Sequence, residues 1–246
     1  MPLVKVCQNG DTTRAEHPAA PMTPDQLAAD ARACRDAGAG ALHFHVYDPE
    51  GVQTLEAEPT AAALQAVRAA VPGMPVGLST AIDIAGGDAE RRLGLVSAWT
   101  VKPDFVSLNI CEPGADALAA LLLDDLGVGV EVGTWSVDDI GALEAAPWRD
   151  RLVRVLIEPW EEDGEAAVAL VDAVEEALDA AGLLSVPRLH HGTGFATWAV
   201  IDAALARGRD VRIGLEDTVQ MPDGSVARDN AAMVAAAVQK ARSGGT

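Results

Sequence analysis

Short apolar segments alternate with alanine-rich segments along the whole chain, and this alternation limits the possible folds more than any other feature. Apolar runs bounded by turn residues are typical of buried strands, whereas longer periodic runs that end at glycine are typical of helices. The predicted strands are Val4–Gln8, Ala41–Val46, Val76–Thr80, Phe105–Ile110, Gly129–Thr134, Leu152–Glu158, Arg188–His191 and Val211–Glu216. The predicted helices are Pro24–Ala37, Thr60–Ala70, Ala89–Trp99, Asp116–Leu126, Val137–Ala145, Glu165–Ala181, Thr197–Arg207 and Arg228–Arg242.

Eight strand–helix units with no break in composition predict an α/β protein, a single-domain (β/α)₈ TIM barrel over residues 1–246. The alternative is an open, doubly wound sheet. No Gly-x-Gly-x-x-Gly motif follows the first predicted strand, and eight repeats favour closure, so we prefer the barrel.

Composition excludes several classes of protein. The net charge of −19 repels nucleic-acid phosphates, which argues against a nucleic-acid partner. The three cysteines, Cys7, Cys34 and Cys111, lie far apart, which argues against a disulfide framework and suits a reducing compartment. Neither a signal peptide nor an apolar run of about 18 residues is visible, so we expect a cytoplasmic protein without a membrane partner.

Side chains alternate faces along a strand, so each predicted strand sends one set of residues toward the barrel interior. This inward set is strongly polar: Lys5, Cys7, His43, His45, Ser79, Ser107, Asn109, Glu131, Arg154, Glu158, Arg212 and Glu216. A buried charge needs a partner. Lys5 and Arg154 either pair within the barrel or serve a site.

The strongest candidate site is a metal centre formed by His43, His45 and Glu216. The two histidines end the second predicted strand and Glu216 ends the eighth, and both strands flank the first in a closed barrel. Active sites of such barrels lie at the carboxyl ends of the strands. Three imidazole or carboxylate ligands with one open position are typical of catalytic zinc, although manganese, iron or cobalt is possible. Zinc there would polarise a substrate carbonyl.

Three further charged residues lie near the same strand ends. Arg212 can hold a substrate carboxylate or orient Asp217 through a forked hydrogen bond, or the two can form a structural ion pair. Glu131, which we expect at the end of the fifth strand across the mouth of the barrel, can serve as an acid or base, or pair with an arginine.

Small polar residues end two other predicted strands. Ser79 and Thr80 end the third, and Ser107 and Asn109 lie in the fourth, where they are suited to bind a carboxylate or an oxyanion. After the seventh strand, His190–Gly194 either binds a cofactor phosphate, as glycine-rich loops of this fold often do, or places His191 in a surface loop.

Several short segments distributed over almost the whole chain carry a resemblance to a known family. They are Asn9-Gly10, His17–Pro21, Thr23-Pro24, Ala37–Ala39, His43–Asp48 with Gly51, Ser107–Asn109, Arg212–Asp217 and Asn230. In these segments the chain resembles the β-keto acid cleavage enzyme family. The pairing of His-x-His-x-x-Asp with Arg-x-Gly-Leu-Glu-Asp is the most specific part of this resemblance.

The resemblance implies a zinc-dependent barrel that condenses a β-keto acid with acetyl-CoA. The products are acetoacetate and a new CoA thioester, formed by a Claisen-type carbon–carbon cleavage. It matches His43, His45 and Glu216 to the metal ligands, and Arg212 and Asp217 to a catalytic pair. It also implies active-site roles for Glu131 and Ser79, and a homo-oligomer, dimer or tetramer.

We expect Ser107, Asn109, Thr80 and Tyr47 to contact the substrate or CoA. The chain departs from the family pattern at several points. Tyr47 stands where an arginine is usual, Cys7-Gln8 where an acidic residue is frequent, Ser107 in place of a threonine and Thr134 in place of an aspartate. The chain is also shorter than typical members.

Two alternatives to this function follow from the residues. A phenol at position 47 supplies no permanent cation, which favours a CoA-independent, metal-assisted aldol or retro-aldol lyase. The second alternative is a non-catalytic barrel that binds a metal or a small acid.

Overall fold

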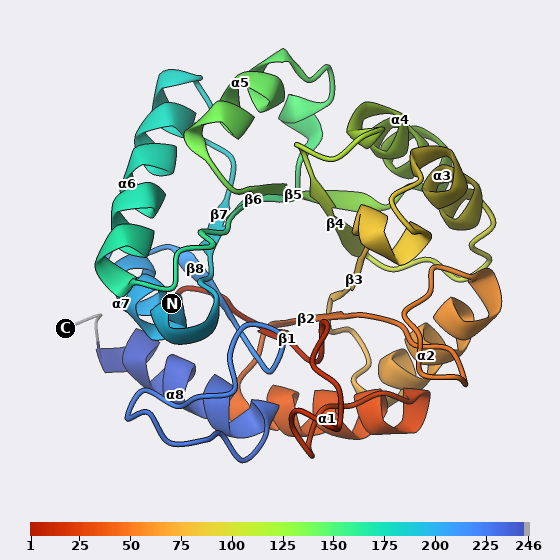
Figure 1. Ribbon diagram of the computed structural model, residues 1–246, viewed down its shortest axis with the longest axis horizontal. Coiled ribbons are helices and arrows are strands. Elements are labelled where there is room, and N and C mark those ends of the chain that lie inside the picture. Colours follow the sequence, from red (N-terminus) through yellow and green to blue (C-terminus); the bar gives the residue numbers. More distant parts are fainter. Residues whose placement is uncertain (244–246) are drawn as a thin grey trace.

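Eight parallel strands form a closed barrel in which each strand pairs with its neighbours in sequence and β8 pairs with β1 (Figure 1). The computed structural model describes residues 1–243. The strands are β1 Val4–Cys7, β2 Ala41–Phe44, β3 Val76–Ser79, β4 Phe105–Asn109, β5 Gly129–Thr134, β6 Arg154–Ile157, β7 Arg188–His190 and β8 Asp210–Ile213. The prediction of a (β/α)₈ barrel is confirmed, and the open doubly wound sheet is excluded.

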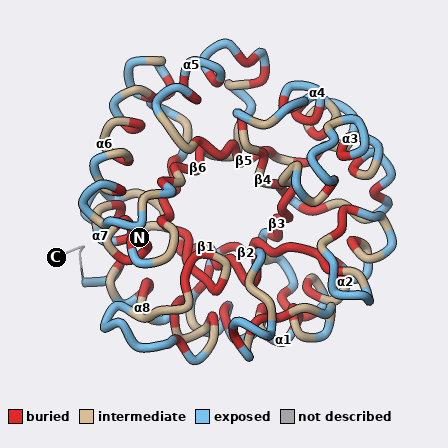
Figure 2. The backbone as a smooth tube through the Cα atoms, viewed as in Figure 1, coloured by how far each residue is buried: buried red, intermediate tan, exposed pale blue. Residues whose placement is uncertain are grey.

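Helices surround the barrel and bury their apolar faces against the strands, so that burial is concentrated in the inner ring (Figure 2). They are α1 Pro24–Ala37, α2 Ala57–Ala70, α3 Ala89–Ser97, α4 Ala115–Ala120, α5 Val137–Ala145, α6 Gly164–Ala180, α7 Thr197–Ala206 and α8 Asn230–Ser243. Shorter helical segments are η1 Ile82–Ala85, η2 Leu121–Leu126, η3 Arg149–Arg151 and η4 Gly194–Ala196. Among residues 1–243, no helix combines the length and the apolar character needed to cross a bilayer.

The start of α1 illustrates how local sequence sets these boundaries. The Thr23 hydroxyl accepts a hydrogen bond from the Gln26 backbone N–H, and the Gln26 side chain accepts from the Thr23 backbone N–H. This reciprocal capping satisfies backbone donors that the first helical turn leaves free. Pro24 follows at the first helical position, where its fixed φ favours the helix.

The barrel interior below the site contains a buried charge cluster. Glu131 of β5 and Lys5 of β1 form an ion pair in which neither side chain is exposed, and Arg154 Nε of β6 lies 3.2 Å from Glu131 Oε1. Of the two alternatives for Lys5 and Arg154, the structure therefore shows pairing within the barrel, with Glu131 as the shared partner.

Two element boundaries differ from the predicted ones in ways that matter. β8 ends at Ile213, so Glu216 lies in the following turn and not at the strand end as predicted. The predicted helix 116–126 is divided into α4 and the π-helical segment η2, which ends at Gly127 in a left-handed conformation. The other predicted elements are present, mostly within three residues of their observed ends.

Candidate active site

A cavity of about 440 Å³ opens at the carboxyl ends of the strands. Its lining combines residues from most of the strand–helix loops. These are Asp11, His45, Val52, Gln53, Ser79, Ala81, Asp83, Ile84, Ser107, Asn109, Leu156, Glu158, Trp160, Thr193, Arg212, Glu216 and Asp217. The position agrees with the location of active sites in barrels of this kind.

The structure brings the three predicted metal ligands together around the Glu216 carboxylate. His43 Nε2 lies 3.7 Å from Glu216 Oε2, and His45 Nε2 lies 3.6 Å from Glu216 Oε1. Metal bonds of 2.0–2.3 Å in tetrahedral geometry separate neighbouring ligand atoms by roughly 3.3–3.8 Å. Each of these two distances matches the spacing of two ligands on one ion. The residues whose ligand atoms all lie within 4.8 Å of one another are Cys7, His43 and Glu216, and His45, which faces the other oxygen of Glu216, lies outside that group.

Two glycines allow Glu216 to reach this position from a turn. A Cβ at Gly214 would lie 1.8 Å from the Cys7 carbonyl oxygen, so the chain can approach β1 this closely only at a glycine. Gly10 has φ +56°, and a Cβ there would lie 2.2 Å from Glu216 Cγ. Both residues keep free the space that the Glu216 segment occupies.

Gln53 fixes the orientation of the His45 ring. His45 Nδ1 lies 2.6 Å from Gln53 Oε1, so Nδ1–H donates to the amide oxygen and Nε2 is turned toward Glu216, 3.6 Å from Oε1. Tyr47 and Gln53 form an antiparallel bridge across the turn that contains Gly51. Gln53 could not be identified as a site residue from the sequence, because only this turn brings it back beside His45.

Burial and charge set the protonation of the cluster. Burial lowers the pKa of His43 well below its usual value, which keeps that imidazole neutral. Burial alone would raise the pKa of Glu216, but Arg212 and the two histidines outweigh it and hold that pKa well below its usual range. Burial raises the pKa of the Cys7 thiol. A neutral imidazole beside a carboxylate is a suitable donor set for a divalent metal.

Arg212 is held between two carboxylates. Its Nε and Nη2 donate to Asp217 Oδ1 at 3.0 and 2.6 Å, and Nη2 also donates to Glu216 Oε1 at 2.8 Å. Within the described residues, Asp217 Oδ2 has no hydrogen-bond partner although it is buried. The Asp217 carboxylate is therefore held through one oxygen and available through the other.

His191 joins Asp217 to a second acid. Its Nδ1 lies 3.5 Å from Asp217 Oδ1 and its Nε2 lies 3.5 Å from Glu158 Oε2. Burial and Arg212 lower the pKa of His191, but the two carboxylates outweigh them and raise it. His191 is buried, which excludes the surface-loop alternative. The alternation of side chains along the predicted strands had indicated that Glu158 faces the barrel interior. His191 follows the end of β7, where this alternation no longer applies.

The other predicted site residues divide into two groups. Ser79, Ser107 and Asn109 line the cavity. Thr80 and Tyr47 do not line it: the Thr80 hydroxyl donates to the Ser107 carbonyl at 2.6 Å, and the Tyr47 hydroxyl donates to the Gly10 carbonyl at 2.6 Å.

Glu131 lies lower in the barrel than predicted. It is the third residue of the six in β5 and is paired with Lys5, and it does not line the cavity. The alternation of side chains along the strand predicted correctly that Glu131 points into the barrel. It did not predict how far below the mouth of the barrel Glu131 lies.

The chain is similar in sequence to two proteins that carry the same name. The chain is 24% identical over 248 residues to a protein named 3-keto-5-aminohexanoate cleavage enzyme from Fusobacterium nucleatum, covering 94% of this chain and 88% of that protein. A protein of the same name from Acetoanaerobium sticklandii is 27% identical over 110 residues, 44% of this chain and 39% of that protein.

Among solved structures, a ternary complex of ObcA with a C4-CoA adduct and oxalate superposes with a TM-score of 0.75 and 18% identity. The match covers 93% of this chain and 65% of ObcA, so this chain spans about two thirds of that structure and the likeness supports the fold. The model of the beta-keto acid cleavage enzyme family matches residues 3–135 and 166–246. The chain therefore belongs to the beta-keto acid cleavage enzyme family.

Proposed function

We propose that this protein is a zinc-dependent enzyme that condenses a β-keto acid with acetyl-CoA, giving acetoacetate and a new CoA thioester. The observation that carries the proposal is the meeting of His43, His45 and Glu216 beside the Arg212–Asp217 pair in one cavity. The family membership and the name of the Fusobacterium relative support the substrate class.

The residues present fit a divalent metal. Neither ring nitrogen of His43 has a hydrogen-bond partner among residues 1–243, although the side chain is only 1% exposed. Glu216 Oε2 is likewise buried without a hydrogen bond in the described part of the chain. Buried polar atoms are rarely left unsatisfied, and a cation between His43 Nε2 and Glu216 Oε2 satisfies both of these atoms at once. We therefore assign His43, His45 and Glu216 as ligands, and zinc supplies Lewis-acid polarisation of the substrate carbonyl when bound.

Asp217 is the proposed general base. Its free Oδ2 accepts a proton from the α-carbon of the β-keto acid, while Arg212 holds Oδ1 and keeps the carboxylate in place. Ser79, Ser107 and Asn109, which line the same cavity, supply hydrogen bonds to the substrate carboxylate and to developing negative charge. Glu131 contributes through the barrel interior, in contact with Lys5 and not with substrate.

In the overall reaction, the bond between the α-carbon and the ketone carbon of the β-keto acid breaks. A new bond joins that α-carbon to the acetyl carbonyl of acetyl-CoA as the acetyl–sulfur bond breaks, and the proton held by Asp217 returns to the α-carbon, which gives acetoacetate. The acyl fragment leaves on the CoA sulfur, so no oxidant or reductant is required.

A CoA-independent lyase is the second candidate, because the cavity offers little to bind the phosphates of CoA. Arg212 is the one arginine or lysine among the lining residues in the described part of the chain, and two carboxylates already engage it. Tyr47, which stands where the family usually has arginine, points its hydroxyl at the Gly10 carbonyl.

One experiment separates these candidates. Zinc content is measured on the purified protein, and a panel of β-keto acids is then assayed for consumption of the acid and for acetoacetate, with and without acetyl-CoA. Acetoacetate that requires acetyl-CoA supports the proposal. Turnover that is unchanged without acetyl-CoA selects the lyase, and stoichiometric zinc without any turnover selects a non-catalytic metal-binding barrel.

We also propose a homo-oligomer, dimer or tetramer, in the cytoplasm. Two large aromatic side chains beyond the ends of β6 and β7 are exposed, Trp160 by 56% and Phe195 by 72%, and such side chains are frequent at interfaces. Size-exclusion chromatography with light scattering should give a multiple of 25.4 kDa.

A further inference from the structure

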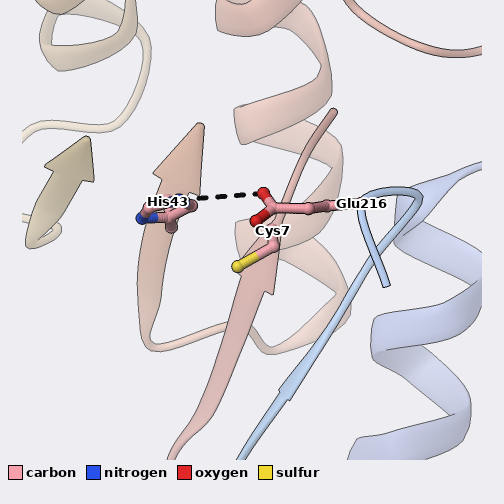
Figure 3. Close-up of side chains that lie close together, drawn as sticks. All are labelled: Cys7, His43 and Glu216. Carbon is pink, nitrogen blue, oxygen red and sulfur yellow. Dashed lines mark ion pairs between the residues drawn. The ribbon is translucent and has the colours of Figure 1, made fainter. Parts of the chain in front are cut away.

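Cys7 lies at the same level of the barrel as His43. The two residues are register partners on the parallel strands β1 and β2, so their side chains point to the same face, toward the interior (Figure 3). Neighbouring strands are about 4.8 Å apart, which is close to the span of a metal site. The Glu216 turn covers this pair from β8, and Glu216 N lies 3.5 Å from the Cys7 carbonyl oxygen.

The sulfur approaches the same point as two of the assigned ligands. Cys7 Sγ, a His43 ring nitrogen and a Glu216 carboxylate oxygen all lie within 4.8 Å of one another. That limit is about 1 Å beyond the spacing of two ligands on one ion. Cys7 is fully buried, and neither His43 ring nitrogen nor Glu216 Oε2 has a hydrogen bond within residues 1–243.

A second buried cysteine provides a contrast. Cys34 in α1 has its sulfur 3.6 Å from Asp30 Oδ2 and belongs to the apolar cluster between barrel and helices. Cys7 instead faces polar atoms that lack partners, in an interior position where an apolar side chain would serve packing equally well. This difference indicates a ligand role for Cys7 and a packing role for Cys34.

We propose that Cys7 is a fourth protein ligand, so that the metal centre is formed by one cysteine, two histidines and Glu216. This inference rests on the proposed metal-dependent function. On binding, the thiol proton leaves to solvent and the sulfur–metal bond takes its place.

The cavity shows why a fourth ligand is compatible with catalysis. His45 and Glu216 line the cavity, whereas Cys7 and His43 do not. The sulfur would therefore bind a metal from the buried side of the site, and the cavity side would remain open to the substrate. Catalytic zinc can expand to five ligands, which admits a substrate oxygen beside four protein donors. A soft thiolate also shifts the preference of the site from manganese toward zinc or cobalt.

Cobalt substitution tests this proposal without reference to turnover. The protein is stripped with a chelator and titrated with Co²⁺, while the near-ultraviolet absorption is recorded. We expect one equivalent to bind with a thiolate-to-cobalt charge-transfer band. Cys7→Ser should abolish the band and weaken Co²⁺ binding by at least about tenfold, as loss of a direct ligand should exceed the effect of an outer partner.

Cys34→Ser and Cys111→Ser are the matched controls, one for a buried and one for an exposed cysteine, and both should retain the band. Cys7→Ala serves as a second variant if the serine form does not fold. Binding of one Co²⁺ without the band, or a band that persists in Cys7→Ser, overturns the cysteine ligand while the three-ligand centre stands. No metal binding by the unaltered protein overturns both.

Discussion

At the scale of single residues, the two oxygens of the Asp217 carboxylate have different surroundings. Oδ1 accepts from Arg212, whereas Oδ2 is buried and, within the described residues, free of hydrogen bonds. Asp217→Asn keeps the shape and the contact with Arg212 but removes the basic oxygen. We expect kcat/KM to fall by about 10²–10⁴-fold, the usual contribution of a general base. Steady-state assays with the active β-keto acid measure this.

The same variant should retain its metal, because Asp217 is not one of the assigned ligands. Asp83→Asn is the control, since Asp83 also lines the cavity but is exposed, and its activity should remain close to that of the unaltered protein. Zinc lost together with activity in Asp217→Asn would contradict the assignment of Asp217 as a base.

Gly10 offers a second test at this scale. Gly10→Ala introduces a Cβ 2.2 Å from Glu216 Cγ, so Glu216 must move away from the histidines. We expect the variant to lose most of its zinc, as measured by metal analysis after dialysis. The positive φ also adds about 1–3 kcal/mol of backbone strain.

Gly51→Ala separates the two effects of the Gly10 substitution. Gly51 also has a positive φ, +82°, but a Cβ there meets no atom within 4 Å. This control carries the backbone strain and should keep its zinc. Equal loss of metal in both variants would show that strain, and not the position of Glu216, controls binding.

At the scale of elements, strand parity predicted which residues face the interior but could not predict the ends of strands. His43 and Arg212 lie in strands, and parity placed both correctly. Glu216 and Asp217 are adjacent in sequence, yet both contact Arg212, which strict alternation does not allow. The turn after Ile213 produces this arrangement through the close approach of Gly214 to Cys7, a tertiary contact that no local pattern encodes.

The packing of α6 against β7 predicts a dependence of stability on pH. Burial alone would raise the pKa of Glu175, but hydrogen bonds from His190, Arg209 and Arg188 outweigh it and lower that pKa to about 2. His190 Nε2 lies 2.8 Å and Arg209 Nη2 lies 2.6 Å from the carboxylate. A lowered carboxyl pKa stabilises the fold above the unfolded value near 4.5, and this stabilisation is lost as the pH falls toward 2.

Glu175→Gln measures that contribution. Urea unfolding at pH 7 should show a loss of about 2–3 kcal/mol in the free energy of unfolding relative to the unaltered protein. The difference between the two proteins should shrink as the pH is lowered from 4.5 toward 2, because the native carboxylate then becomes protonated as well. A difference that stays constant over this range would argue against the ionised carboxylate as the source.

At the scale of the whole molecule, the eightfold repeat was sufficient to predict closure of the barrel. The sequence did not reveal how charged residues of distant strands share the interior. Lys5, Glu131 and Arg154 come from β1, β5 and β6, and the barrel brings them into one cluster. How deep a side chain lies inside a barrel depends on the stagger between neighbouring strands, and the alternation of side chains along one strand does not encode this stagger. For this reason the prediction placed Glu131 at the mouth.

The last prediction tests whether Glu131 supports the barrel or the chemistry. Glu131→Gln leaves the buried Lys5 without an ionised partner, and removal of one member of a buried pair typically destabilises a protein by about 3–5 kcal/mol. Urea unfolding at pH 7 measures this loss. Asp124→Asn is the control, since Asp124 pairs with Arg151 at the surface and such exposed pairs contribute about 0–1 kcal/mol. Because Glu131 lies outside the cavity, the folded fraction of Glu131→Gln should retain zinc and turnover. Unchanged stability combined with lost turnover would instead assign Glu131 a direct catalytic role.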